Sequence, residues 1–488
     1  GPRGHAVVYT IAPSPVTEGV IWAGTDDGLI QLTSDGGAHW RDVTPHDLKP
    51  WSKISVIDAS YSDAQTAYAA VDRHRLDDVN AYIYRTRDGG AHWDLVVDGI
   101  PYGAFVRAVR ADPERKGLLY AGTELGVYVS FDDGDHWQPL QLNLPTVPVR
   151  DLAVHGNDLV VATHGRAFWI LDDVTPLRQL TDDVVHDRAH LFRPAAAVRL
   201  RRSENNDTPL PPEEPHGENP PAGAIIDYWL GAQPGGPVEI DILDDQGNVV
   251  RRVASTDTAL PPSSPPYFTD WWLPQFRPPT PNAGHNRYVW DLRYAPPPAP
   301  GYSYSISAIA GEGTIAQPQG PLVRPGTYAV RLTVDGQTQT QPLEVKADPR
   351  VDVPDSVFAH QLDLALDIWH SMADGMALQG EADSLRTQVA AVDRTGLDRQ
   401  TTSALDALIG RLNGLQPARL AGTMGSLEEV VTGADREPPQ QVRDAYAELK
   451  RQLTVQQHAW QEVVEGTLPG LNRRLRAQGR AELVASRP

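Results

Sequence analysis

The chain has 488 residues, which predicts about three domains at the usual ~100 to 200 residues per domain, and it has no Cys, which excludes disulfides, thiolate metal sites and cysteine nucleophiles. Its 43 Lys and Arg against 63 Asp and Glu give a net charge of -20, a field that repels phosphate backbones and anionic membranes. No stretch approaches the ~20 apolar residues of a membrane span, so we expect neither a nucleic-acid partner nor membrane insertion.

The first residues, Gly1 to His5, carry neither a start Met nor a signal peptide. We expect the chain to begin partway through a longer product, or Gly1-Pro2 to be the remnant of a protease site. The 43 Pro and 41 Gly favour short strands and turns over long helices, except near the C-terminus.

Three segments of the first third share the form Ser/Thr-x-Asp-x-Gly-x-x-Trp, namely residues 33–40, 86–93 and 130–137. We call them the Asp boxes. Their chemistry is that of a hairpin turn, because the Asp side chain can accept hydrogen bonds from its own turn, the Gly takes a positive φ, and the Trp begins the next strand by burying its ring. We therefore interpret the boxes as structural.

Each box belongs to a longer repeat that begins with an additional strand. The expected first strands are residues 7–11, 54–59, 106–110 and 149–154, and the fourth repeat has no box. The boxes begin at positions 33, 86 and 130, so their spacings are 53 and 44 residues, close to the ~40 to 50 residues of a β-propeller blade. We therefore predict four blades of four strands each in residues 5–180.

Four blades pose a question of ring closure. Propellers typically have about 4 to 8 blades, so these four either close on themselves or belong to a larger ring. We favour the larger ring, since an open stack of four blades would leave two sheet faces exposed to solvent, and such faces tend to bind another protein surface.

The blade topology also sorts the polar residues of this region. In a four-stranded antiparallel blade, the turns between the second and third strands emerge on the same face as the links between blades, and the Asp boxes emerge on the other. The candidate catalytic carboxylates on the first face are Asp72, Asp77, Asp78 and Glu124. The candidate ligand-binding residues there are Asp26, Asp27, Trp51, Arg73, His74, Arg75, Tyr102, His164 and Arg166. Such a mixture suits a polyhydroxylated or charged ligand.

Several of these residues have a second, structural interpretation. Asp26 and Asp27 are favoured as turn residues, and Trp51 could pack between blades instead of supporting a sugar ring. The charged insertion 72–78 interrupts a regular repeat, which indicates either a functional loop or a network of ion pairs. Three of its side chains could reach one ion, but no established metal-binding spacing occurs, so we predict no metal and no cofactor.

The boxes and their flanks resemble the bacterial neuraminidase repeat superfamily, which includes sialidases, xyloglucanases and sortilin-like receptors. Segments 70–78, 116–132 and 162–173 more closely resemble large bacterial proteins named sortilin-like or glycosyl hydrolase repeat proteins. The resemblance implies that this chain is the C-terminal half of such a protein. It also implies an N-terminal propeller half as partner, from the same precursor or a separate chain, and a periplasmic or extracellular location.

Two further modules are expected after the blades. Residues 181–223 are interpreted as a linker that becomes rich in Pro, Glu and Asn, and residues 224–347 alternate as in an immunoglobulin-like β-sandwich. Segments 244–250, 288–292 and 325–332 of this stretch resemble the sandwich found in flagellar-hook cap proteins and bacterial secretion modules. An insertion at residues 261–281 carries several aromatics among prolines, which we interpret as an inter-domain clasp or, alternatively, a sugar-stacking loop.

The periodicity changes from two to 3.6 after residue 350, and residues 352–488 are predicted to form an antiparallel helical bundle. One apolar stripe contains Phe358, Leu362, Ala365, Leu366, Trp369, Met372 and Met376. Ser426 and Glu429 have the spacing of a capping box, which predicts the start of a short helix.

Taken together, the sequence predicts a mainly β, multidomain protein. The leading hypothesis is an exported propeller protein that binds a glycan or a peptide on the face formed by the inter-strand turns and the inter-blade links. A glycoside hydrolase that uses paired carboxylates on the same face is the first alternative, and a structural assembly module is the second.

Overall fold

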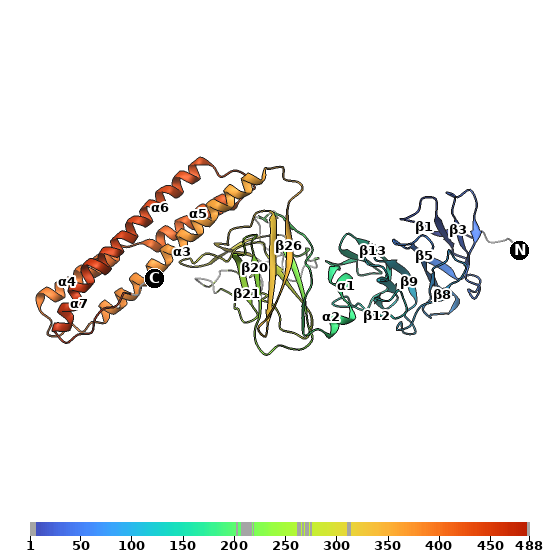
Figure 1. Cartoon of the computed structure of the whole chain (residues 1–488), viewed down its shortest axis with the longest axis horizontal. Helices are drawn as coiled ribbons and strands as arrows, with labels where there is room; N and C mark the ends of the chain where they lie inside the picture. Colours follow the sequence, from blue (N-terminus) through green and yellow to red (C-terminus); the bar gives the residue numbers. More distant parts are fainter. Residues whose placement is uncertain are drawn as a thin grey trace. The chain divides into compact units, whose positions relative to one another are not determined.

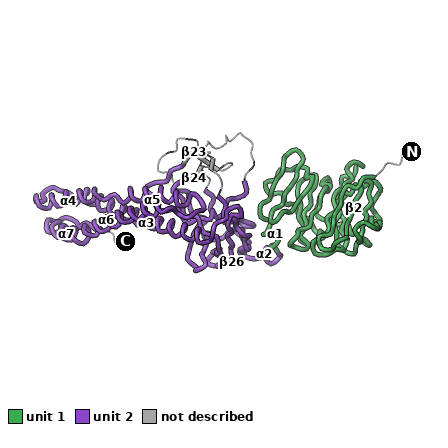
Figure 2. The backbone as a smooth tube through the Cα atoms, turned by 90° about the horizontal axis from the view of Figure 1, so that it is seen from above, with its two compact units in different colours: residues 1–180 green, residues 181–488 purple. Residues whose placement is uncertain are grey.

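The computed structural model describes residues 6–201, 204–205, 217, 219–260, 265, 268, 273, 276–309 and 314–485. The chain divides into two compact units, Gly1–Leu180 (unit 1) and Thr181–Pro488 (unit 2) (Figure 2). Regular structure is mostly β-sheet up to residue 347 and helical after it (Figure 1). Among the described residues, no helix is both long enough and apolar enough to cross a bilayer.

Unit 1 consists of four antiparallel sheets, each built from strands that are consecutive in the chain. Sheet 1 contains β1 (Val8–Pro13), β2 (Ile21–Thr25), β3 (Ile30–Thr33) and β4 (Arg41–Asp42). Sheet 2 contains β5 (Lys53–Ala59), β6 (Ala67–Asp72), β7 (Ile83–Thr86) and β8 (Asp94–Leu95). Sheet 3 contains β9 (Val106–Ala111), β10 (Leu119–Thr123), β11 (Gly126–Ser130) and β12 (Gln138–Pro139). Sheet 4 contains β13 (Val149–His155), β14 (Asp158–Thr163) and β15 (Phe168–Leu171).

Sheet 4 departs from the predicted four strands per repeat, because it has only three. The fourth repeat lacks the box whose Trp would begin an outer strand. Instead, Asp173 turns the chain with a φ of 57°, and a Pro in the first turn starts the helix α1 (Thr175–Gln179).

The Asp boxes have the geometry expected of hairpin turns. In all three, one Asp oxygen accepts hydrogen bonds from the hydroxyl two residues before it and from the backbone N–H four residues after it, at 2.8 to 3.0 Å. The second oxygen lies 2.7 Å from Nδ1 of the box His. These bonds, first among them the backbone bonds from His39 and His92, lower the pKa of Asp35 and of Asp88 to about 2.

The four sheets of unit 1 stack on one another in chain order, since each neighbouring pair shares a buried apolar cluster. The three clusters contain, respectively, the pairs Trp22 and Ile57, Ile83 and Val109, and Tyr120 and Leu152. The first strand of sheet 2 serves both neighbouring interfaces, since Ile57 lies in the cluster shared with sheet 1 and Val56 packs against the cluster shared with sheet 3.

Unit 2 begins with the short helix α2 (Asp182–His186), and its described residues form three sheets. The strand order of the first is β16 (Ala189–Leu191), β19 (Ala224–Leu230) and β22 (Gly284–Trp290). The order of the second is β17 (Ala197–Arg199), β26 (Gln337–Ala347), β25 (Gly326–Val334), β20 (Val238–Leu243) and β21 (Val249–Ala254). The third consists of β18 (Glu204–Asn205), β23 (Ser303–Ile309) and β24 (Thr314–Gln317). The first two sheets share one core around Trp290, Ile226 and Val330.

The expectation of a linker at residues 181–223 is wrong for its first part. There, β16 pairs with β19, and β17 pairs in parallel with β26. These two strands have three residues each, too few for an alternating pattern to show in the sequence. Of the aromatic insertion, Tyr267, Trp271 and Trp272 lie outside the described residues.

The helical region contains α3 (Asp355–Ala391), α4 (Arg399–Gly414), α5 (Pro417–Thr432), α6 (Gln440–Gln461), a π-helical segment (Glu462–Thr467) and α7 (Leu468–Ala477). Helices α3, α5 and α6 pack on one another, and α4 packs on α3 and α7 (Figure 1). The predicted stripe on α3 is buried at Phe358, Leu362, Ala365 and Met372. The expected helix start at Ser426 is wrong, because Ser426 lies inside α5, which begins at Pro417.

Glu428 of α5 gives unit 2 a pH dependence. Its side chain is buried, and its Oε1 has no hydrogen-bond partner. Burial raises the pKa of this carboxyl from 4.5 to about 7, although Arg293 acts in the opposite direction. Between these values the folded state holds a proton that the unfolded state has released, so stability falls as the pH rises. In the parent, the free energy of unfolding should therefore fall by roughly 2 to 3 kcal/mol as the pH rises across this range. We expect this fall to be absent in Glu428→Gln.

Urea unfolding of unit 2, followed by circular dichroism at several pH values between about 4.5 and 8, measures this effect. Glu448→Gln, which removes an exposed carboxylate of α6, is the control. Its free energy of unfolding should change with pH as steeply as that of the parent. An unchanged slope in Glu428→Gln would contradict the assignment.

Candidate ligand-binding site

One edge of the sheets in unit 1 collects the turns between second and third strands together with the links that precede first strands. We call it the turn edge. Four backbone hydrogen bonds join turn and link there, Trp51 N to Asp27 O at 2.7 Å, Gly103 N to Val79 O at 3.3 Å, Glu124 N to Phe105 O at 3.0 Å and His164 N to Pro148 O at 2.8 Å. The expected site residues therefore lie at the corresponding end of every sheet.

A charged network joins the turn edges of sheets 2 and 3. The side chain of Asp72, which ends β6, is 3% exposed. Its Oδ1 lies 2.5 Å from Nδ1 of His74, and its Oδ2 accepts a hydrogen bond of 3.3 Å from Nη1 of Arg107. Arg107 also donates from Nη2 to Oε2 of Glu124 at 2.8 Å. The ring of His74 stacks on Phe105, with centroids 5.0 Å apart. One guanidinium thus connects two of the predicted carboxylates.

A second ion pair holds the insertion against the preceding link. Arg73 donates from Nε to Oδ2 of Asp78 at 2.8 Å and from Nη1 to the hydroxyl of Ser52. The Tyr82 hydroxyl donates to the same carboxylate at 2.9 Å. Partial burial raises the pKa of Asp78, but hydrogen bonds from Arg73, Asn80 and Tyr82 outweigh it and bring the pKa to about 2. Asp78 therefore holds the loop in place as a carboxylate.

Other predicted residues of the turn edge face solvent. Trp51 is 61% exposed and Tyr102 is 77% exposed, and Arg75 and Asp77 are exposed as well. Trp51 has a φ of 62° and Asp77, which follows the 3₁₀ turn His74–Leu76, a φ of 56°. A bulky residue rarely adopts this conformation, which costs about 1 to 3 kcal/mol and is found most often at functional sites. The fold thus holds an indole ring out of the core at this edge.

The remaining predicted residues lie at the turn edge without joining the network. Asp26 Oδ1 accepts a hydrogen bond of 2.8 Å from the backbone N–H of Val7, and Asp27 Oδ1 one of 2.5 Å from the Thr25 hydroxyl. These are turn contacts. His164 and Arg166 are exposed in sheet 4, and His164 bonds to Arg150. Within the described residues, no hydrogen bond or ion pair links them to the network of sheets 2 and 3.

Two residues of this site escaped the sequence analysis. Arg107 was missed because it lies inside an expected first strand, whereas the candidates were drawn from turns and links. A charged residue in the otherwise apolar run 104–109 is nevertheless a usable signal. Ser52 carries no such signal, because its partner Arg73 is 21 residues away.

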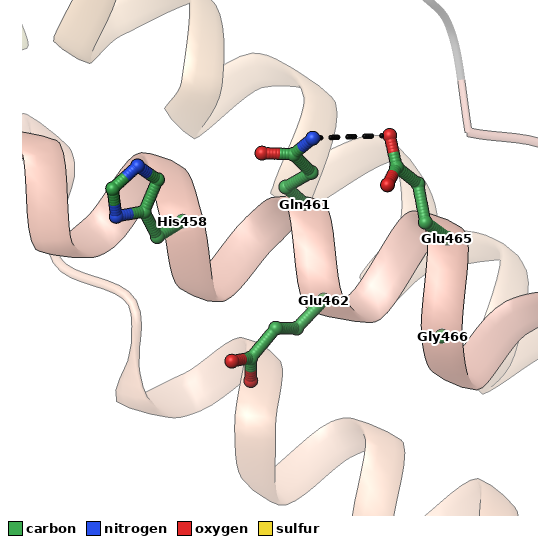
Figure 3. Close-up of a pocket in the computed structure, with 5 residues that line it drawn as sticks. All are labelled: His458, Gln461, Glu462, Glu465 and Gly466. Carbon is green, nitrogen blue, oxygen red and sulfur yellow. Dashed lines mark hydrogen bonds between the residues drawn. The ribbon is translucent and has the colours of Figure 1, made fainter.

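No set of three or more His, Asp and Glu side chains in the described part of the chain is arranged to hold a metal ion. A hollow of about 540 Å³ lies elsewhere, on the end of α6 and the π-helical segment (Figure 3). Its lining residues are His458, Gln461, Glu462, Glu465 and Gly466. Figure 3 shows Gln461 bonded to Glu465, at 3.1 Å, with Glu462 on a different side of the helix. All five lining residues belong to one helical segment.

No family model and no curated protein matches the chain. Among solved structures it is similar to YCF48 bound to D1 peptide, with 17% identity, a TM-score of 0.28 and coverage of 34% of this chain and 52% of that one. YCF48 from Cyanidioschyzon merolae has 16% identity and a TM-score of 0.27, with coverage of 35% of this chain and 54% of that one. The GH74 xyloglucanase from Xanthomonas campestris has 11% identity and a TM-score of 0.27, with coverage of 69% of this chain and 38% of that one. The chain therefore spans about half the length of the two YCF48 structures. At these TM-scores the similarities define neither the fold nor the function.

Proposed function

We propose that unit 1 is part of an Asp-box β-propeller and that its turn edge binds a glycan or a peptide. The observation that carries the proposal is the repeated pairing of turn and link, which puts the exposed rings of Trp51 and Tyr102 at the same edge as the charged network. Aromatic faces stack on sugar rings or on peptide side chains, and Arg75, exposed in the turn of sheet 2, adds a cation to the same edge.

Glycoside hydrolysis is the second candidate, because Arg107 connects the carboxylates of Asp72 and Glu124. Hydrolysis needs two carboxyl groups about 5 to 9.5 Å apart that flank the scissile bond. Here both are engaged by one guanidinium and Asp72 is buried, an arrangement that favours binding over turnover. A scaffold without a ligand is the third candidate.

The proposal includes further blades that complete the ring, supplied by an N-terminal half of the same precursor or by a separate chain. We further propose that the two sheets of unit 2 with a common core form an immunoglobulin-like sandwich, and that sandwich and helices support the propeller. The resemblance to exported bacterial proteins supports a periplasmic or extracellular location, and cell fractionation tests it.

The binding proposal predicts that Trp51→Ala and Tyr102→Ala each weaken ligand binding roughly tenfold or more, because each removes a stacking surface. The measurement is titration calorimetry with ligands first found on a panel of neutral and acidic oligosaccharides and short peptides. Tyr61→Ala is the matched control, since Tyr61 is also exposed, at 44%, but lies between β5 and β6 at the opposite edge.

Equal affinity of the Trp51, Tyr102 and Tyr61 variants would contradict binding at the turn edge. Release of reducing sugar by the parent, with loss of that activity in Glu124→Gln, would favour the hydrolase. If neither binding nor turnover occurs once the ring is complete, the scaffold is the better account.

A further inference from the structure

The second and third Asp boxes each dock on the sheet before them through the same contact. Nε1 of Trp93 donates to the carbonyl of Val43 at 2.7 Å, and Nε1 of Trp137 donates to the carbonyl of Val96 at 3.0 Å. Val43 and Val96 occupy equivalent places, since each directly follows the outer strand of its sheet. The ring of Trp93 also meets Trp22 of the preceding sheet edge-on, at 5.9 Å between centroids.

The glycine of each box makes the same contact possible. A Cβ placed on Gly90 would lie 2.6 Å from Cβ of Val43, and one placed on Gly134 would lie 3.0 Å from Cγ2 of Val96. A side chain at either position would push the two sheets apart, so these glycines are needed for close approach as well as for the turn. A box in this repeat is therefore both a hairpin turn and one half of an inter-sheet contact.

The first box has the Trp and the Gly of this contact, but no preceding sheet in the described part of the chain lies against them. Trp40 is 45% exposed, whereas Trp137 is 4% exposed. Within the described residues its Nε1 has no hydrogen-bond partner, and its ring lies against Gly37 of its own turn, 3.8 Å from where a Cβ would stand. The residues needed for docking are present, but no sheet of the described part of the chain packs against them.

The first strands repeat the same asymmetry at two further positions. Strand pairing makes Val8 equivalent to Ile54, Val106 and Val149, and Ile11 equivalent to Ile57, Val109 and Leu152. The six counterparts are at most 2% exposed, packed in clusters shared with the preceding sheet, whereas Val8 is 55% exposed and Ile11 is 64% exposed. Three independent positions thus point outward from the same sheet.

We propose that Val8, Ile11 and Trp40 form a docking face for a further four-stranded sheet of the same repeat. The occupant must carry a small residue in its second strand, as Gly24 and Gly122 do opposite Ile54 and Val149. It must also carry an apolar residue with a free carbonyl directly after its outer strand, as Val43 and Val96 do. The proposal rests on the proposed propeller arrangement and gives it residue-level contacts.

The fourth sheet of a second copy does not meet these requirements. Within the described residues sheet 4 has no outer strand, and the chain passes from β15 through Asp173 into α1. It therefore lacks the carbonyl that Trp40 would bond. The occupant is a complete four-stranded sheet that differs from sheet 4 of this chain.

The test supplies such a sheet by duplication. A second copy of residues 53–104, which contains sheet 2 and the link after it, is joined directly before Val7 of the full chain. This junction keeps the register, since Val7 and Phe105 accept equivalent hydrogen bonds from Asp26 and Glu124. The readout is hydrogen exchange of the Trp40 indole N–H, assigned with Trp40→Phe.

We expect exchange at Trp40 to slow by about tenfold or more in the extended protein, because the indole gains a buried acceptor. Val96→Asp in the added copy alone should abolish the protection, and the same change in the resident copy should leave it intact. An indole as exposed in the folded extended protein as in the parent overturns the docking face. Concentration-dependent protection of Trp40 in the parent, with dimer formation in ultracentrifugation, overturns the choice of occupant.

This experiment is independent of ligand binding. The turn edge carries Trp51 and Tyr102, and neither is part of the docking face. If exchange at Trp40 is not slowed but the ligand binds through Trp51 and Tyr102, only the docking face is refuted. If exchange at Trp40 is slowed but the variants at Trp51 and Tyr102 bind as the parent does, only the ligand site is refuted.

Discussion

Asp72→Asn is expected to destabilise unit 1 by about 3 to 5 kcal/mol, because it removes one partner of a buried ion pair. The side chain of Asp72 is 3% exposed and that of Arg107 is 10% exposed. The amide carries no charge and keeps one acceptor oxygen where the carboxylate has two, so the guanidinium retains only Glu124 as an anionic partner. The amide NH2 group then faces either Arg107 or His74 in place of an acceptor. Chemical denaturation followed by tryptophan fluorescence measures the change in the free energy of unfolding.

Asp77→Asn is the matched control, since it makes the same chemical change in the same loop on an exposed side chain. Asn tolerates the positive φ of this position, so we expect a change within about 0.5 kcal/mol. Equal effects of the two variants would show that the buried network contributes nothing to stability. The two variants also help to interpret binding measurements. A loss of ligand binding in Asp72→Asn could result from unfolding, whereas a loss in Asp77→Asn would report on the ligand site itself.

What could be predicted in unit 1 depended on how local the contacts are. The box turns were predictable because the Asp35 carboxylate bonds to residues within four positions of it, such as Thr33 and His39. The turn edge was predictable from topology alone, once the repeat was recognised. The charge pairing was not, since Arg107 meets Asp72 and Glu124 across 35 and 17 residues. Nothing in the sequence indicated that Asp72 would be buried by a residue of the next sheet.

In unit 2, what could be predicted depended on the length of each strand or helix. Long strands such as β19, β20 and β25 carry enough residues for alternation to show, and all three lie within the span 224–347 in which alternation was found. The three-residue strands β16 and β17 were hidden in an expected linker, because their place in the sheets depends on β19 and β26. The capping-box pattern at Ser426 misled for a related reason, since favourable packing continues α5 through a sequence that can also start a helix.

The strand β17 also ties the sheets of unit 2 to its helices. Arg199 is 2% exposed and donates to Asp435, to Gln361 of α3 and to the carbonyl of Val323. Arg201 donates from Nε to the same oxygen of Asp435 at 2.6 Å. Burial lowers the pKa of Arg199, while Asp435 raises it. One carboxylate, 5% exposed, thus serves two arginines in a region with little access to water.

Asp435→Ala is expected to destabilise unit 2 by about 3 to 5 kcal/mol, because it leaves the Arg199 guanidinium buried without an anionic partner. Denaturation followed by circular dichroism of the helices measures the change. Asp367→Ala is the control, since it breaks the pair of Asp367 with Lys450, whose side chains are 48% and 50% exposed. An exposed pair contributes about 1 kcal/mol or less, so equal losses in the two variants would show that the buried carboxylate does not hold the sheets and helices of unit 2 together.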